Sequence, residues 1–189
     1  MIKTLCVGNN YIVMQTNLLS QSIADFFISD TFLPVILCIG SDKVTGDALG
    51  PIVGELLTSK FDIPCFVYGT LSSTVTALNV QKTLSYIRRR HPNRKIIAVD
   101  SGLGDENAVG KVKCYVGGIK PGQGVGKNLQ VVGDFSVLGV VDNKRNAHLL
   151  SSLSLGRIYR LAQEVALTIS GGIENLITSK LSSSPPFTV

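Results

Sequence analysis

Two aspartates, Asp47 and Asp100, are the residues with the clearest potential for chemistry. Asp47 ends the polar loop that follows the apolar run Val35–Ile39, and Asp100 directly follows the apolar run Lys95–Val99. If both runs are neighbouring strands of a doubly wound sheet, their carboxyl ends border one crevice, where ligands bind in such folds. Carboxylates that share a site split their pKa values, so one can act as a base while the other stays protonated. The pair could therefore activate water for attack on a carbonyl.

The same two side chains also have purely structural interpretations. Asp47 is well placed to cap a helix across residues 48–60. Asp100 could serve only to accept hydrogen bonds from backbone amides. The spacing of the two residues leaves both interpretations open.

A glycine-rich loop, Pro121–Lys127, is a second candidate. It does not fit a phosphate-binding Walker motif, because Pro121 stands where that motif needs glycine and Asn128 stands where it needs Ser or Thr. Glycines favour positive φ and close backbone approach, here to an extended peptide. We expect the loop to line the cleft, and the predicted substrate-binding residues are Gly46, Gly122, Gly124, Gly126 and Lys127.

Metal and cofactor chemistry are not predicted. The two histidines, His91 and His148, stand in no recognisable spacing with Asp47 or Asp100, so no metal site is indicated. The dinucleotide-binding glycine pattern is missing after Gly40. We therefore expect no bound cofactor and no metal.

The four cysteines, Cys6, Cys38, Cys65 and Cys114, are widely spaced and form no C-x-x-C motif. This pattern indicates free thiols in a reducing cytosol rather than zinc ligands or disulfides. Polar residues near the start of the chain break any apolar signal segment, so no signal peptide is predicted.

Length and composition favour one globular domain. The chain has 189 residues, of which 44% are hydrophobic and 16% charged, with 19 glycines. Its apolar runs, such as residues 32–40, are shorter than the roughly 20 residues that a membrane-spanning helix needs. Disorder and a membrane span are therefore not expected.

The net charge is +5, and its visible focus is Arg88–Arg90 with Arg94 and Lys95 beyond. Such a cluster can bind nucleic acid. It also suits the last turn of a helix, where cations complement the helix dipole. Because aromatic residues make up 6% of the chain and Trp is absent, the helix-end interpretation is favoured over nucleic-acid binding.

Hydrophobic periodicity predicts an α/β fold with a parallel core, because strands and helices alternate in the first half of the domain. We expect a domain over 34–180, an N-terminal extension over 1–33 with one helix near Leu18–Ile28, and a frayed tail over 181–189. The expected strands are 35–39, 65–68, 95–99, 111–116, 129–132 and 136–141, and the expected helices of the domain are 48–60, 74–90 and 155–176.

Three motifs in a fixed order carry a family resemblance: Thr45–Pro51, Ile97–Asp100 and Pro121–Lys127. Together they resemble the spore germination protease, an aspartic-type endopeptidase. The chain looks more like the related YyaC family of sporulation proteins, supported by the Tyr68–Leu71 turn and by the segments 91–93 and 132–134. The resemblance covers residues 34–175, and the first 33 residues carry none of it.

This resemblance implies a hydrogenase-maturation-protease-like fold, a three-layer α/β/α arrangement with a mostly parallel central sheet. It also implies that Asp47 and Asp100 match the functional aspartates of the protease and hydrolyse a peptide bond. The implied partner is a peptide or small spore protein in the cytoplasm of the spore or forespore. One departure is Ser101–Gly104, where the protease would have Ala-Leu-Ala, so the substrate wall differs. Nickel, which related maturation proteases bind, is disfavoured because Ala48 follows Asp47.

Two alternatives remain beside hydrolysis. One is a catalytically silent relative that binds a peptide or protein partner in the same cleft during spore formation. The other is association with nucleic acid through Arg88–Arg90. The sequence leaves open whether the chain forms a homo-oligomer.

Overall fold

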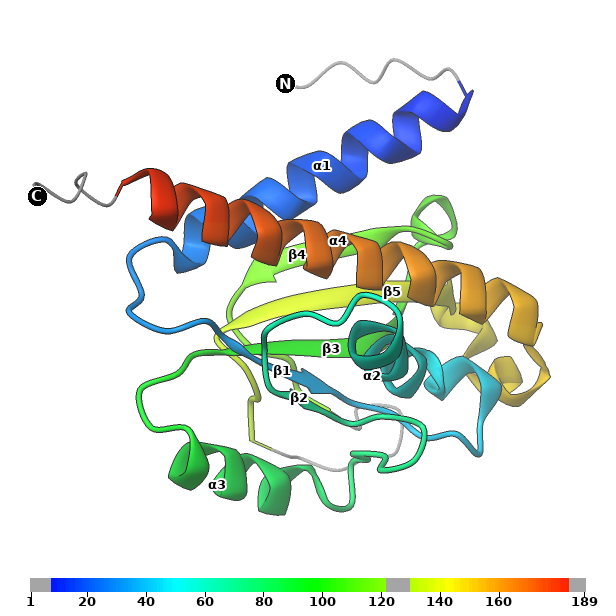
Figure 1. Cartoon of the computed structure of the whole chain (residues 1–189). Helices are drawn as coiled ribbons and strands as arrows, with labels where there is room; N and C mark the ends of the chain where they lie inside the picture. The colour runs from blue at the N-terminus through cyan, green and yellow to red at the C-terminus, as the bar shows by residue number, and fades with distance from the viewer. Residues whose placement is uncertain (1–7, 122–129, 184–189) are drawn as a thin grey trace, which may run out of the picture.

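The computed structural model describes residues 8–121 and 130–183. The helices and strands of these residues are, in chain order, α1 (Gly8–Phe27), β1 (Val35–Cys38), the 3-10 turn η1 (Thr45–Asp47), α2 (Leu49–Ser59), β2 (Val67–Tyr68), α3 (Val80–Arg90), β3 (Ile96–Gly104), η2 (Glu106–Ala108), β4 (Val112–Val116), β5 (Phe135–Asn143), η4 (Lys144–Ser152) and α4 (Leu155–Ser182) (Figure 1). The predicted α/β class is confirmed.

Five strands of the described chain form one mixed, mostly parallel sheet in the order β2-β1-β3-β5-β4. β4 runs antiparallel to β5, and the other neighbouring pairs are parallel. The predicted adjacency of the first and third strands of the domain is confirmed, since Cys38 of β1 pairs with Val99 of β3. The carboxyl ends of these two strands therefore lie side by side.

Helices cover both faces of the sheet, which gives the predicted three layers (Figure 1). On one face α1, α2 and α4 share a core with residues such as Ile36, Val99 and Val137. On the other face α3 packs over Leu37 and Ala98. Alternate residues of each strand thus point into two separate apolar layers.

The N-terminal helix α1 begins earlier than the predicted Leu18–Ile28 and runs from Gly8 to Phe27. Ile23 and Phe27 are fully buried and belong to the same core as the sheet. Phe27 also packs edge-on against Phe26 and obliquely against Phe135 at the start of β5. This segment therefore contributes directly to the core of the domain.

Other boundaries also differ from the predictions. α3 begins at Val80 rather than residue 74, because Asn79 closes a turn before it by accepting a hydrogen bond from the Thr76 amide at 2.7 Å. α4 continues to Ser182, into the predicted tail. The strand predicted over 129–132 includes one residue outside the described part, and Val132 forms a single bridge with Ile119.

β3 is longer than predicted, because pairing with β5 carries it on to Gly104. Asp100 therefore lies inside the strand and not at its end.

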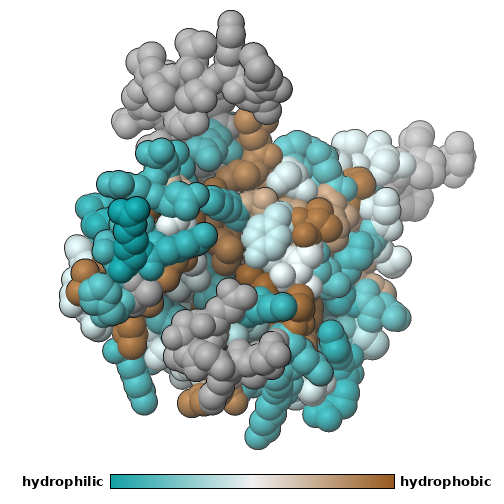
Figure 2. Space-filling model, turned by 180° about the vertical axis from the view of Figure 1, so that it is seen from behind, coloured by the Kyte–Doolittle hydropathy of each residue, from teal (hydrophilic) through white to brown (hydrophobic). Residues whose placement is uncertain are grey.

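None of the described helices has the length and apolar character of a membrane span. The side of the molecule opposite to Figure 1 gathers apolar surface in its middle, between polar flanks (Figure 2).

Candidate functional site

The turn that carries Asp47 is held tightly against the end of β1. The Ser41 amide donates to the Asp47 carbonyl at 3.0 Å, and the Asp47 amide donates to the Val44 carbonyl at 2.9 Å. Gly40 has a φ of +148°, and a Cβ at this position would collide with the Asp47 carbonyl. Glycine is required here because no side chain fits between the strand end and the turn. These contacts fix where Asp47 stands.

The prediction that Asp47 caps a helix was wrong. α2 begins at Leu49, its N-cap residue is Ala48, and no side chain caps it. Gly50 in the first turn packs so closely on Ile39 that a Cβ would collide with the Ile39 carbonyl. Packing against β1 therefore fixes the start of this helix, and the Asp47 carboxylate is left for another role.

Asp100 lies on β3 immediately past the end of β1, because Val99 is the last residue that pairs with β1. Its Oδ1 accepts a hydrogen bond from the Ser101 amide at 2.8 Å. The interpretation of Asp100 as a backbone acceptor is thus true for this oxygen. The carboxyl is largely surrounded by protein but still reaches a cavity.

Both aspartates line one cavity of about 800 Å³. A cavity of this size falls within the range of roughly 300–1,000 Å³ that is usual for ligand-binding pockets. The other lining residues are spread along the middle of the chain: Ile39, Gly40, Val44, Ala77, Ser101, Gly102, Leu103, Tyr115, Gly118, Ile119, Lys120, Leu138, Val141, Lys144 and Leu150. The crevice predicted at the strand ends is therefore present.

The cavity changes the acidity of both carboxyl groups. Burial raises the pKa of Asp100 well above its ordinary value of 3.8, and the nearby charge of Asp47 raises it further. The Ser101 amide offsets part of that rise. Burial also raises the pKa of Asp47, opposed by a hydrogen bond from the Ser41 backbone. Because the rise is larger for Asp100, Asp47 ionises first and Asp100 retains its proton to higher pH.

No lysine, arginine or histidine of the described residues forms an ion pair with either aspartate. The ion pair found in that part of the chain joins Lys95 to Asp30 at 2.9 Å. Lys120 and Lys144 line the cavity at exposed positions without reaching ion-pair distance of either carboxylate. Within the part of the chain that the structure describes, the two aspartates therefore influence each other without a neutralising cation.

The remaining predicted site residues fall in two places. Gly46 is not among the lining residues: it is buried under Leu150, which does line the cavity. The predicted loop residues Gly122, Gly124, Gly126 and Lys127 lie outside the described residues.

Several lining residues were missed by sequence reasoning. Tyr115, Lys144 and Leu150 come from β4 and from η4, which follows β5. No local motif marks these positions, so sequence patterns had no signal that could find them. Lys120 directly precedes the glycine-rich loop and could have been included with it.

Histidine and cysteine take no part in this cavity as far as the structure describes it. His91 caps the end of α3, where its Nε2 lies 2.7 Å from the Tyr68 hydroxyl. Cys38, Cys65 and Cys114 are free thiols, as predicted. Burial raises the pKa of Cys65 and of Cys114 to about 12, so neither is an activated nucleophile.

The described residues contain no group of three or more metal-ligating side chains.

A protein-family profile described as "Protein of unknown function (DUF1256)" matches residues 7–168. The chain belongs to this DUF1256 family. The match begins at residue 7, so the prediction that the first 33 residues lie outside the family resemblance was wrong. In physical terms, α1 supplies part of the core that defines the domain.

Among curated proteins, this DUF1256 chain is 44% identical over 108 residues to "Uncharacterized protein YyaC" of Bacillus subtilis strain 168. The predicted resemblance to the YyaC family is thus confirmed. The match covers 57% of this chain and 53% of that relative, so it spans about half of the relative's length.

Among solved structures, this DUF1256 chain is similar to the NiFe hydrogenase maturation protease HycI from Thermococcus kodakarensis KOD1. The two are 18% identical, with a TM-score of 0.41, and the match covers 78% of this chain and 98% of that one.

Proposed function

We propose that this DUF1256 chain hydrolyses a peptide bond, with Asp47 and Asp100 as its acid–base pair. The observation that carries the proposal is that both carboxyls share one cavity, where the charge of Asp47 raises the pKa of Asp100. Structural carboxylates are normally matched by cations or by several donors. Among the described residues Asp47 and Asp100 have no ion-pair partner, and two such carboxyls in one cleft are candidates for acid–base chemistry.

The differing pKa values of the two carboxyls assign their roles. Asp47, the more easily ionised, takes a proton from a water molecule, whose oxygen attacks the peptide carbonyl carbon. Asp100, protonated, gives its proton to the carbonyl oxygen, which forms a neutral tetrahedral intermediate. Asp47 then passes its proton to the leaving nitrogen as the C–N bond breaks. Asp100 recovers its proton from the intermediate's hydroxyl, which regenerates both groups.

The substrate we propose is a peptide or small spore protein in the cytoplasm of the spore or forespore. The support is the ordered set of motifs that resembles the germination protease, including Thr45–Pro51 around Asp47. A cavity of about 800 Å³ with mixed polar and apolar walls is compatible with several residues of an extended peptide.

The test is cleavage of small spore proteins by the wild-type chain and by Asp47→Asn and Asp100→Asn variants. Each variant keeps the shape of the carboxyl but removes its proton chemistry, so we expect a roughly 10²- to 10⁴-fold loss of kcat. Asp42→Asn is the matched control, because Asp42 is exposed in the same loop and does not line the cavity.

Equal cleavage by all three variants would contradict the proposal. A wild-type chain that binds these proteins but yields no product by mass spectrometry would replace hydrolysis with the silent, peptide-binding alternative.

A further inference from the structure

Exposed aromatic rings gather near the carboxyl end of α3. Phe32, Phe66 and Tyr86 are 43%, 50% and 48% exposed, and they come from the segments before β1 and before β2 and from α3 itself. Single exposed rings are normal on a protein surface, but a group of them marks an interaction site. Because the three segments are far apart in the sequence, only the fold brings these rings together.

Ring contacts join these segments to one another. The Phe66 ring stacks on the His91 ring, with centroids 4.1 Å apart and planes 28° apart. The Tyr68 ring meets the Tyr86 ring edge-on, with centroids 6.1 Å apart. The Tyr68 hydroxyl lies 2.7 Å from His91 Nε2, which links the two ring pairs. The rings therefore form one continuous group.

Arginines lie against this group. The Arg94 guanidinium carbon is 4.9 Å from the centroid of the Phe32 ring and 5.4 Å from that of the Phe66 ring, so it joins Phe32 to the others. Burial lowers the pKa of His91, and the nearby charges of Arg94 and Arg90 lower it further, which places both cations close to that ring. We call the whole surface the aromatic–arginine patch, and its members are Phe32, Phe66, Tyr86, Arg90, His91 and Arg94.

A hollow of about 280 Å³ adjoins the patch, because Arg94 lines it as well. One Arg94 donor is used by the Leu33 carbonyl at 2.8 Å, which holds the side chain and leaves its other N–H groups for a ligand. Arg88 is a second cation in the wall. The acidic lining residue, Asp134, already accepts a hydrogen bond from the Ile96 amide. The hollow therefore suits an anion.

The charge around the patch has one sign along the chain. Residues 63–99 include no Asp or Glu, and their basic residues are Lys82, Arg88, Arg89, Arg90, Arg94 and Lys95. In the part of the chain with described positions, Arg88–Arg90 are exposed and form no ion pair. Their place in the last turn of α3 complements the helix dipole, which explains the cations but not the exposed rings beside them.

A polyanion with flat aromatic groups matches both features. Proteins that bind single-stranded nucleic acid combine a basic surface, which follows the backbone, with aromatic side chains on which bases stack. An acidic protein would match the charge alone. A duplex would match it too, but its bases are already stacked on each other.

The patch lies apart from the aspartate cavity. The hollow and that cavity have no lining residue in common. Phe32 and Phe66 precede β1 and β2, at the amino ends of the parallel strands, whereas Asp47 and Asp100 lie toward the carboxyl ends. A ligand on the patch therefore leaves the cavity accessible.

We propose that the aromatic–arginine patch binds single-stranded nucleic acid. Bases stack on the exposed rings of Phe66 and Tyr86, and a backbone phosphate enters the hollow between Arg88 and Arg94. Stacking accepts every base, so the binding has little sequence preference. The inference is independent of the proposed hydrolysis, because it uses other residues at the other end of the sheet.

The probe is a fluorescein-labelled oligothymidylate of about 15 nucleotides, a length that one binding surface can span. Binding to the full chain is measured by fluorescence anisotropy over a range of salt concentrations, for the wild type, Tyr86→Leu, Tyr86→Phe and Arg88→Gln. Tyr159→Leu and Arg160→Gln are the matched controls, because this exposed pair lies on α4, on the opposite face of the sheet. Thermal melts check that each variant is folded.

We expect Tyr86→Leu to weaken binding at least about 5-fold, which corresponds to the smallest usual loss for one stacked base. Tyr86→Phe should bind as the wild type does, because it keeps the ring. Arg88→Gln should reduce the slope of log K against log salt by about 0.7, the value for one phosphate contact to a single strand. Both controls should leave the affinity and the slope unchanged.

Three other results would overturn the inference. One is a duplex of the same length that binds as tightly as the single strand, since stacking would then have no part. Another is poly-L-glutamate that displaces the probe as well as unlabelled oligothymidylate does, which would indicate a site for an acidic protein instead. The third is a wild type that does not bind the probe at low salt, or that loses no more affinity in Tyr86→Leu than in Tyr159→Leu.

Discussion

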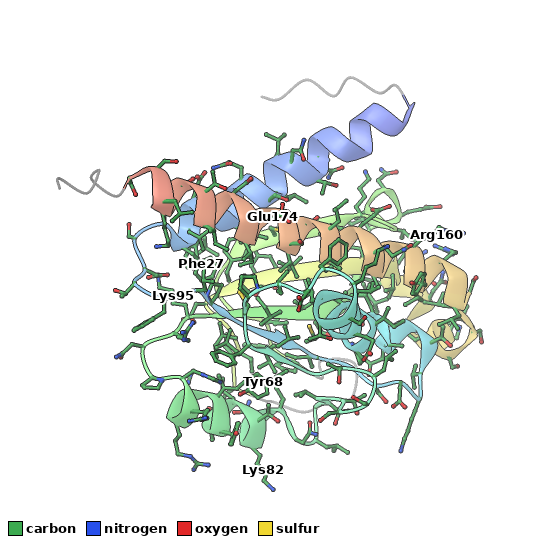
Figure 3. The ribbon with its side chains drawn as sticks, viewed as in Figure 1. Phe27, Tyr68, Lys82, Lys95, Arg160 and Glu174 are labelled. Carbon is green, nitrogen blue, oxygen red and sulfur yellow. The ribbon has the colours of Figure 1, made fainter. Side chains whose placement is uncertain are left out.

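The two ends of the central sheet treat their acidic side chains differently. At the amino ends of β1 and β3, Asp30 pairs with Lys95 at 2.9 Å and Asp134 accepts the Ile96 amide at 2.8 Å. Figure 3 places Lys95 at that end of the molecule, near Phe27. At the carboxyl ends, Asp47 and Asp100 share a cavity without an ion-pair partner in the described part of the chain.

This difference separates carboxylates that stabilise the fold from carboxylates that are costly to it. An ionised group that is buried without a partner raises the free energy of the folded state, which appears as a raised pKa. A folded protein retains such groups most readily where they serve chemistry. The comparison therefore predicts opposite outcomes for substitutions at the two ends.

The largest expected effect is on activity at the carboxyl ends. Asp100→Asn should lower kcat roughly 10²- to 10⁴-fold because it removes the proposed acid. Asp134→Asn, at the amino end, should change kcat less than twofold in the same cleavage assay. Similar losses in both variants would erase the distinction between the two ends.

The next largest effect is on stability at the amino ends. Asp134→Ala removes the acceptor of the Ile96 amide and should lower the free energy of unfolding by about 1 kcal/mol. Asp105→Ala is the control, because Asp105 is exposed and its side chain makes no cap bond to η2. Urea denaturation measures both variants, and an unchanged midpoint for Asp134→Ala would refute a structural role.

The pH dependence of stability should reveal the carboxyl-end pair. The folded-state pKa of Asp100 lies above its unfolded value. The protonated carboxyl therefore contributes fully to the free energy of unfolding below about pH 3.8, and this contribution is lost as pH rises through the folded pKa. Between the unfolded and the folded pKa, the free energy of unfolding falls by at most about 1.4 kcal/mol for each step of one in pH. Asp100→Asn should therefore flatten this fall, and at neutral pH the variant should be at least as stable as the wild type by thermal melting. A neutral-pH loss of stability in the variant would contradict this account.

The smallest effect is expected for the ion pair at the amino end. Lys95 and Asp30 are partly exposed, at 41% and 23% of their side chains, so the pair is screened by solvent. Lys95→Met should lower stability by less than about 1 kcal/mol, and added salt should reduce that difference. A large, salt-independent loss would show that the amino end depends on this pair more than its exposure suggests.

The positions of Asp47 and Asp100 could be predicted because they depend on local signals. The change from an apolar run to a polar residue marks where the fully buried part of a strand ends, and the order of strands in doubly wound sheets brings such points together. The adjacency of β1 and β3 follows that rule. The place where Asp47 and Asp100 meet could thus be predicted from two short segments of sequence.

Other features depend on contacts between distant segments and left no local pattern. The extension of β3 past Asp100 depends on its pairing with β5. The capping interpretation of Asp47 failed because close packing of Gly50 on Ile39, rather than a side-chain cap, fixes the start of α2. Lys144 and Leu150 reach the cavity because η4 folds back over η1, where Leu150 covers Gly46.

The most direct test of a shared site is the titration of the Asp100 carboxyl carbon by ¹³C NMR, in the wild type and in Asp47→Asn. We expect a wild-type midpoint well above 3.8, because burial and the Asp47 charge both raise it. In Asp47→Asn the midpoint should fall but stay above 3.8, since the charge is gone and the burial remains. An ordinary wild-type midpoint, or one that Asp47→Asn leaves unchanged, would contradict the account of the two aspartates as one interacting pair.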